Sequence, residues 1–214
     1  MFKVTILNIK SELTQNEFDI LLHRVSTEKQ DRIRRFHFFK DAQNCLLSDV
    51  LARVEICRIT GLSNELLEFS TNEYGKPFLV NNPHIHFNIS HTDDYVTFAI
   101  ADEPVGIDIE TMKPIDLRIA ERFFTTDETT YIMAGDQIQR FYEVWTKKES
   151  RIKWEGRGLH KLLSSFSVFD LIEKKKICYN KVFHDVKDIC HVCSRKRGKP
   201  FVKIIDTEIL LQQL

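Results

Sequence analysis

The chain has 214 residues, of which 43% are hydrophobic and 29% are charged, and its 31 basic residues balance its 31 acidic ones. This composition is typical of a soluble globular protein, and the charge balance gives no support for generic nucleic-acid binding, which normally shows as a basic excess. We also expect no membrane partner, because no run approaches the ~20 apolar residues that a membrane span needs.

The first nine residues alternate like a strand and lack the long apolar stretch of a signal peptide. The five cysteines are an odd number and lie scattered, at positions 45, 57, 178, 190 and 193. Both features favour a protein of the reducing cytoplasm. Cys190 and Cys193 match the pattern C-x-x-C, but the sequence has no second pair to complete a zinc site, so we interpret them as strand residues.

Taken in chain order, the first half begins with a strand over 2–9 and a helix over about 14–25. Ser26 is a suitable cap for a further helix, which we expect to run through Phe36. Apolar residues at helical spacing then predict a long helix over about 40–59, which Gly61 ends. Four strands follow, over 67–70, 78–80, 85–89 and 95–101, and residues 102–104 form a turn.

The second half repeats this plan. A strand over 105–110 precedes helices over 116–122 and 127–133 and a long helix over 137–154, and strands follow over 165–172, 176–183 and 189–193. Each half therefore has a long helix packed on a small antiparallel sheet. We predict an α+β fold of two similar lobes with pseudo-twofold symmetry, residues 1–104 and residues 105–214, with the active site at their junction.

The most informative residues are four charged side chains near this junction. Asp108 and Glu110 lie two positions apart on a strand and so face the same side, where apolar residues would normally cover a core. Glu149 and Lys153 lie four apart and share one helical face. Three carboxylates and an ammonium suit a hard divalent cation that holds a phosphate. Taken singly, the pairs have plainer interpretations: the polar face of an edge strand, and a solvated ion pair.

Longer strings in the chain resemble the 4′-phosphopantetheinyl transferases of the surfactin-synthetase-activating type. That family carries G-[IV]-D-x-E and W-x-x-K-E-[SA]-x-x-K, which match residues 106–110 and 145–153. It also carries Y-G-K-P and F-N-x-S-H, which match residues 74–77 and 87–91. Any one string is weak evidence, but four in register are specific. Shorter matches at 34–36, 120–124 and 156–159 extend the resemblance over almost the whole chain.

The resemblance implies a reaction. The phosphopantetheine arm of coenzyme A moves to a Ser hydroxyl on an apo acyl or peptidyl carrier protein domain, and adenosine 3′,5′-bisphosphate is released. By resemblance, Asp108, Glu110 and Glu149 hold Mg²⁺, Glu149 is the candidate base for the carrier Ser, and Lys153 contacts the pyrophosphate. The chemistry of these residues agrees, because a metal ion and a Lys can stabilise the negative charge on the leaving phosphate.

The resemblance also implies contacts to coenzyme A. Lys29 and Arg32 match positions where the family places basic residues for the 3′-phosphate, although by composition alone they belong to an ordinary charged helix. Asn44-Cys45 departs from close relatives, which often have Arg followed by Ser or Thr, so a candidate phosphate contact is lost there. The other expected contacts lie in the motifs above: Lys76, Pro77, Ser90, His91, Asp108 and Lys153.

We expect the carrier domain to dock across residues 111–124, through a basic and apolar patch made of Lys113, Arg118, Arg122 and Phe124. Two lobes complete the site within one chain, so we expect a monomer. The two-lobed length favours a pathway of secondary metabolism, such as nonribosomal peptide or antibiotic biosynthesis.

Two other functions remain open. The first is a non-catalytic module that binds coenzyme A or a carrier domain, for which Asn44-Cys45 is the only indication in the sequence. The second is a metal-dependent nucleotide phosphohydrolase, which would use the same carboxylates but gives no reason for a docking patch.

Overall fold

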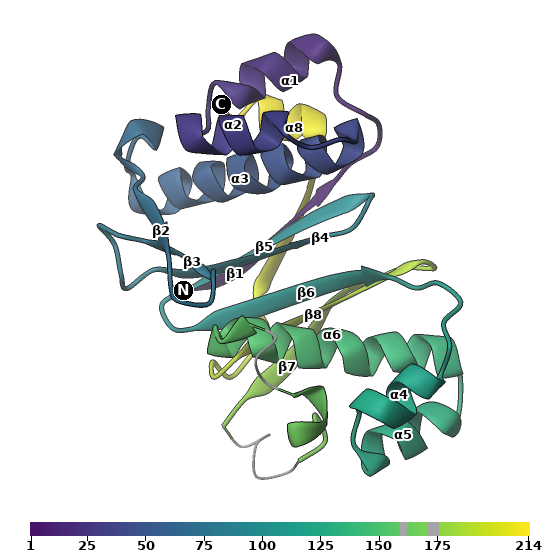
Figure 1. Ribbon diagram of the computed structural model, residues 1–214. Helices are drawn as coiled ribbons and strands as arrows, with labels where there is room; N and C mark the ends of the chain where they lie inside the picture. Colours follow the sequence, from purple (N-terminus) through teal and green to yellow (C-terminus); the bar gives the residue numbers. More distant parts are fainter. Residues whose placement is uncertain (159–161, 171–175) are drawn as a thin grey trace.

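The computed structural model describes residues 1–158, 162–170 and 176–214. Two β-sheets lie against each other in the middle of the molecule, and helices cover the outer face of each sheet (Figure 1). We call the first sheet with its helices the first lobe, in the upper part of Figure 1, and the second sheet with its helices the second lobe.

The first half of the chain builds most of the first lobe. Its helices are α1 (Gln15–Leu22), α2 (Thr27–Arg34) and α3 (Phe39–Thr60), followed by a short 3₁₀ helix, η1 (Asn64–Leu66). Its strands are β1 (Phe2–Asn8), β2 (Phe69–Thr71), β3 (Pro77–Leu79), β4 (His86–His91) and β5 (Tyr95–Ala101).

The second half begins with β6 (Val105–Thr111) and builds the second lobe before it returns to the first. The helices are α4 (Arg118–Phe123), α5 (Thr126–Met133), α6 (Gln137–Glu155), the 3₁₀ helix η3 (Leu163–Ser165) and α8 (Thr207–Leu211). The remaining strands are β7 (Cys178–His184), β8 (Asp188–Ser194) and β9 (Phe201–Asp206).

The two sheets differ in topology. The first has the strand order β4-β5-β1-β9, in which β1 is antiparallel to β5 and parallel to β9. The second has the order β6-β8-β7 and is antiparallel throughout. Strands β2 and β3 form a separate two-stranded ribbon. Because β9 and α8 follow the second sheet in sequence but lie in the first lobe, the chain crosses between the lobes twice.

Apolar side chains fill three layers. Leu47 of α3 and Phe98 of β5 belong to the core between the first sheet and its helices. Ala99 and Ile107 belong to the core between the two sheets. Phe141 of α6 belongs to the core of the second lobe. Since both faces of each sheet are covered, β5 and β8 are buried almost end to end, which agrees with the nearly continuous apolar sequence of β5.

The two long helices end in the same way. Gly61 after α3 and Gly156 after α6 both adopt the left-handed conformation, with φ of 72° and 70°, which glycine reaches without steric cost. The predicted role of Gly61 is therefore confirmed. Ser26 accepts a hydrogen bond from the Lys29 backbone N–H and caps α2, as predicted. Cys190 and Cys193 are buried residues of β8, which confirms their assignment to a strand, and all five cysteines are free.

The predicted fold class is confirmed: each lobe of this α+β protein has a long helix packed on a small, mainly antiparallel sheet. The division at residues 104 and 105 stays a prediction. The predicted strand over 165–172 is wrong for residues 165–170, which form the end of η3 and a turn, and its last two residues lie outside the described ranges. Strand β9 and helix α8 were not predicted. Among the helices described, none is long and apolar enough to cross a membrane.

Candidate active site

The face of β6 that packs on α6 carries Gly106, Asp108 and Glu110. A side chain at Gly106 would place its Cβ 2.0 Å from the Ser150 carbonyl oxygen and 2.3 Å from the Trp154 backbone nitrogen. Only a residue without a Cβ lets the backbone of α6 approach the strand this closely. The glycine therefore brings the charged side chains of α6 down onto the two carboxylates of β6.

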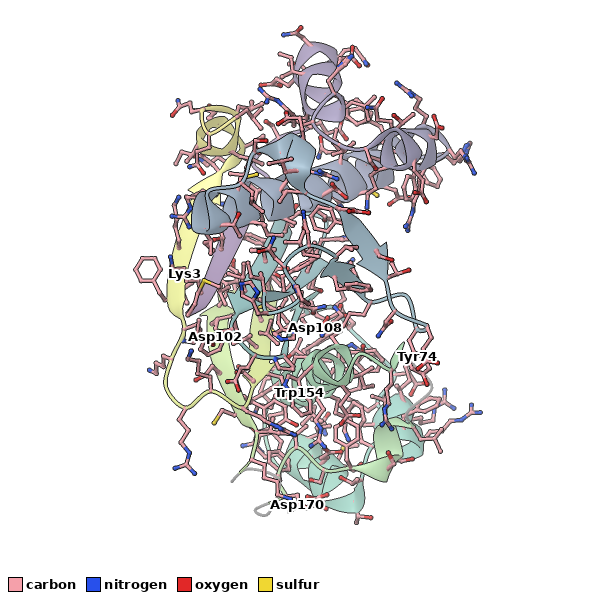
Figure 2. All side chains as sticks on the ribbon, turned by 90° about the vertical axis from the view of Figure 1, so that its left-hand side faces the viewer. Lys3, Tyr74, Asp102, Asp108, Trp154 and Asp170 are labelled. Atoms are coloured by element: carbon pink, nitrogen blue, oxygen red, sulfur yellow. The ribbon has the colours of Figure 1, made fainter. Side chains whose placement is uncertain are left out.

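Asp108 is the centre of the site. Its carboxylate oxygen Oδ1 accepts hydrogen bonds from Lys153 Nζ at 2.7 Å and from Ser90 Oγ at 3.1 Å, and Lys153 Nζ is 2.9 Å from Ser90 Oγ. The three residues come from β6, α6 and β4, so this network joins the two lobes. Figure 2 shows Asp108 in the middle of the molecule, at the junction of the lobes.

Burial dominates the electrostatics of this carboxylate. Asp108 is only 3% exposed, and its second oxygen, Oδ2, is buried without a hydrogen-bond partner among the described residues. Burial raises the pKa of Asp108, and the nearby Lys153 and Ser90 oppose that rise. A buried carboxylate with one unpartnered oxygen is costly unless another positive group meets it.

The other two carboxylates of the predicted metal set share this environment. Glu110 Oε1 accepts a hydrogen bond from Trp145 Nε1 at 3.2 Å. Burial, together with the charge of Asp108, raises the pKa of Glu110 to about 7 and also raises the pKa of Glu149. Within the described ranges, no three Asp, Glu, His or Cys side chains converge as a ready-made metal site, and the Lys153 ammonium lies against Asp108 instead.

A cleft of about 570 Å³ opens in the first lobe between α2, α3 and the strands β2 to β4, and we call it the basic cleft. Lys29, Arg32 and Pro77, all predicted contacts for coenzyme A, line it. A neighbouring hollow of about 320 Å³ is lined by Lys29 and Arg32 again and by His91 and Cys45. The structure thus brings the predicted Lys29, Arg32, Pro77 and His91 together around one region.

The sequence analysis missed four charged residues that line the basic cleft: Glu28, Arg35, Asp49 and Arg53. Asp49 lies 3.2 Å from Lys29 Nζ and 2.6 Å from Arg53 Nε, and Arg53 also stacks over the Phe69 ring at 4.9 Å. Asp49 and Arg53 lie four residues apart on α3, and this spacing indicates an ion pair from the sequence alone. The sequence does not indicate that the two residues line a cleft, because the cleft depends on where α2 and the β2–β3 ribbon pack.

Lys76 points to the lobe junction. Its ammonium donates hydrogen bonds to the backbone carbonyls of Val105 at 3.0 Å, Lys153 at 2.6 Å and Trp154 at 3.4 Å. Burial lowers the pKa of Lys76 to about 8. Its predicted contact with a phosphate therefore stays a prediction, and what the geometry provides is a bond from the first lobe to the C-terminal turn of α6 and the start of β6.

His91 and Asn44 flank the same region. Burial, followed by repulsion from the Lys153 charge, lowers the pKa of His91, which favours its neutral form. Asn44 is 3% exposed and donates a hydrogen bond to the Thr92 carbonyl at 3.2 Å, so it stabilises the loop after β4. Cys45, its neighbour, is the member of the pair that reaches the hollow.

The predicted docking patch needs one correction. Lys113, Arg118 and Arg122 are exposed, as expected. Phe124 is not, because it is only 5% exposed and its ring stacks on Phe141 in the core of the second lobe. Helix α4 ends at Phe123, and the extended backbone of Phe124 turns its side chain inward.

Phe123 is the exposed member of the Phe123–Phe124 pair. It is 42% exposed, and the Arg122 guanidinium lies over its ring at 5.2 Å. Any apolar contact that a partner makes at the end of α4 must therefore use Phe123 in place of Phe124.

Comparison with known proteins identifies the family. Residues 12–103 match the sequence model of the 4′-phosphopantetheinyl transferase N-terminal domain, and residues 104–212 match that of the 4′-phosphopantetheinyl transferase superfamily. The chain is 46% identical to 4′-phosphopantetheinyl transferase ffp of Bacillus subtilis over 73% of its own length and 71% of the relative's. It is 42% identical to 4′-phosphopantetheinyl transferase Sfp of Bacillus subtilis strain 168, over 80% and 82% of the two chains.

A third relative agrees with these two. 4′-Phosphopantetheinyl transferase gsp of Aneurinibacillus migulanus is 40% identical over 78% of this chain and 70% of its own length. The family matches cover both the basic cleft and the carboxylates of the second lobe, and the suspected resemblance is confirmed: this chain belongs to the 4′-phosphopantetheinyl transferase superfamily.

Proposed function

We propose that the chain transfers the 4′-phosphopantetheine arm of coenzyme A to a Ser hydroxyl of an apo carrier protein and releases adenosine 3′,5′-bisphosphate. Membership of the family supports the reaction class. The single observation that carries the proposal for this chain is the buried network of Asp108, Lys153 and Ser90, which joins the carboxylates of the second lobe to β4, the strand of the first lobe whose Ile89 lines the basic cleft. The reaction needs both a site that binds coenzyme A and a site for the chemistry, and this network links the two lobes that carry them.

Coenzyme A fits the basic cleft by its charge. The ligand carries a 3′-phosphate and a pyrophosphate, and the cleft presents four basic side chains, Lys29, Arg32, Arg35 and Arg53, against two carboxylates, Glu28 and Asp49. Charge-assisted hydrogen bonds from such groups to phosphate oxygens are about twice as strong as neutral ones. We assign Lys29 and Arg32 to the 3′-phosphate, with His91 and Ser90 nearer the pyrophosphate.

The donor set of the second lobe fits Mg²⁺. Asp108, Glu110 and Glu149 offer only oxygen ligands, which a hard cation prefers. Burial and mutual repulsion raise the pKa of Glu110 and of Glu149, and Oδ2 of Asp108 lacks a partner among the described residues, so a cation would relieve all three. When bound, Mg²⁺ would supply Lewis-acid polarisation of the pyrophosphate.

The protein's own residues account for the proton and the charge. The carrier Ser oxygen forms a bond to the phosphorus that bears pantetheine, and the bond from that phosphorus to the leaving phosphate breaks. Glu149, the candidate base, takes the Ser proton directly. Lys153, already at the boundary between the lobes, donates to the departing phosphate and stabilises its added negative charge.

The carrier domain approaches from the α4 side of the second lobe in this proposal. Lys113, Arg118 and Arg122 are the basic side chains of this surface, with Arg118 paired to Asp116, and Phe123 gives it an exposed apolar side chain. Charge of this kind raises the rate of encounter, while an apolar contact at the centre slows dissociation. We expect the active species to be a monomer, because both the cleft and the carboxylates belong to one chain.

Intact-mass spectrometry tests the function directly. An apo carrier domain incubated with the protein, coenzyme A and Mg²⁺ should gain about 340 Da, the mass of the transferred group, in a metal-dependent reaction. Tight coenzyme A binding without any gain would point to a non-catalytic binding module. Release of phosphate in the absence of a carrier would point to a phosphohydrolase.

A further inference from the structure

The edge of β6 that faces the first lobe is held by side chains. Strands β4 and β6 lie side by side but belong to different sheets. The Asn88 Oδ1 atom accepts a hydrogen bond from the Ile107 backbone N–H at 2.9 Å, and Ser90 Oγ accepts one from the Ile109 N–H at 3.4 Å. Lys76 adds its bond to the Val105 carbonyl. Side chains at alternate positions of β4 thus meet the backbone of β6 at alternate positions.

Asn88 differs from the other two members of this joint. Lys76 is a predicted contact for coenzyme A and Ser90 is assigned near its pyrophosphate, whereas Asn88 has no part in the chemistry proposed above. Asn88 is 6% exposed, and its bond reaches the residue that directly precedes Asp108. The side chain of Ile107 is itself fully buried between the two sheets, so the amide that Asn88 binds belongs to a rigid part of the strand.

We propose that Asn88 is a positioning residue that sets β6, and with it Asp108 and Glu110, in register with the basic cleft of the first lobe. The proposal rests on the proposed transferase function, in which one lobe holds coenzyme A and the other carries the carboxylates. A misplacement of about 1 Å between reacting groups can lower a rate about 100-fold, so a single bond at the joint has kinetic consequences.

A matched control exists in the same lobe. Gln43 is also a buried side-chain amide, 1% exposed, whose oxygen accepts one backbone N–H, that of Leu13 at 2.6 Å. This bond lies within the first lobe and does not reach β6. Asn88→Leu and Gln43→Met therefore make the same chemical change, the loss of an amide acceptor at nearly constant volume, at the joint and away from it.

The test has two readouts. We expect Asn88→Leu to lower kcat for carrier modification by about 10- to 100-fold and to leave the KM for coenzyme A within about threefold of wild type. Gln43→Met should change kcat by no more than about twofold. Hydrogen exchange, which needs no turnover, should show lost protection at the Ile107 amide in Asn88→Leu, with the Gly106 and Asp108 amides still protected by β8.

Each other result overturns the proposal. Equal losses of kcat in the two variants would make Asn88 a stability residue, and a rise confined to the KM for coenzyme A would make it a ligand contact. If neither Asn88→Leu nor Asn88→Ala folds while Gln43→Met does, Asn88 is needed for the stability of the fold and is not a positioning residue. An inactive wild-type chain would contradict the proposed function, whereas unchanged exchange at Ile107 would contradict this joint.

Discussion

The two lobes carry clusters of opposite charge. The basic cleft of the first lobe has four basic side chains, Lys29, Arg32, Arg35 and Arg53, and two carboxylates, Glu28 and Asp49. The second lobe offers three carboxylates, Asp108, Glu110 and Glu149, around one ammonium, Lys153. Although the formal net charge of the chain is zero, the protein therefore has two local regions of opposite charge. The basic residues line an open cleft, which suits the binding of a ligand. The acidic residues are largely buried, which suits the bond-breaking step.

This comparison predicts that changes in the two lobes affect different kinetic constants. In the acidic lobe, transition-state stabilisation is lost, so kcat falls. In the basic lobe, ground-state binding is lost, so the KM for coenzyme A rises. The predictions below follow from the largest expected effect to the smallest.

Asp108→Ala should lower transfer at least ~1000-fold, because it removes the central carboxylate of the metal set and the partner of Lys153. Circular dichroism should match wild type, since the substitution removes a buried charge and leaves the apolar core intact. A variant with native dichroism and normal Mg²⁺-dependent turnover would end the assignment of this site. Removal of Mg²⁺ from the wild-type enzyme with a chelator should cause a loss of the same order.

Lys153→Ala should reduce kcat about 100-fold through the loss of charge stabilisation on the leaving phosphate. Steady-state kinetics with coenzyme A as the varied substrate separate the two possible roles. An effect on the KM for coenzyme A alone, with kcat at the wild-type value, would mean that Lys153 only binds the ground state, as we expect of the basic residues in the first lobe.

The double variant Lys29→Ala with Arg32→Ala should raise the KM for coenzyme A about 10- to 30-fold and leave kcat nearly unchanged. Dephospho-coenzyme A, which lacks the 3′-phosphate, sharpens the test. Wild type should prefer coenzyme A, and the double variant should lose that preference. A preference that survives the two substitutions would place the 3′-phosphate elsewhere in the cleft.

The smallest effect is expected at the docking surface. Lys113→Ala combined with Phe123→Ala should raise the KM for the carrier protein about fivefold, because both side chains are exposed beyond the site. The KM for coenzyme A should stay at the wild-type value. Movement of the coenzyme A constant without the carrier constant would show that the carrier docks on another surface.

Local patterns were enough to predict most of the fold. The apolar spacing of α3, the Gly61 that ends it and the presence of a second long helix, α6, are properties of short segments, and the structure confirms them. Strand β9 and helix α8 were not predicted. Strand β9 pairs with β1, with Lys3 opposite Phe201, and no local sequence pattern indicates a pairing between residues so far apart in the chain. Its exposed Phe201 and Ile204 also spoil the alternation that marks a half-buried strand.

The candidate site shows the same limit. Asp108, Lys153 and Ser90 could be singled out from their strings, and the structure brings them within hydrogen-bond distance. The sequence does not indicate the orientation of Lys76 or the role of Asn88, because both depend on how β4 and α6 pack against β6. The inward turn of Phe124 depended on a single residue: α4 ends at Phe123, and an additional helical residue would have placed the two rings differently.

The division between a binding lobe and a chemical lobe is tested most directly by calorimetric titration of coenzyme A into Glu149→Gln. The substitution removes the proposed base and keeps the size of the side chain, while Lys29 and Arg32 remain unchanged in the basic cleft. Our account predicts that coenzyme A binds with a Kd within about threefold of wild type although carrier modification falls to background. Loss of coenzyme A binding in parallel with activity would contradict it, because Glu149 would then belong to the binding site itself.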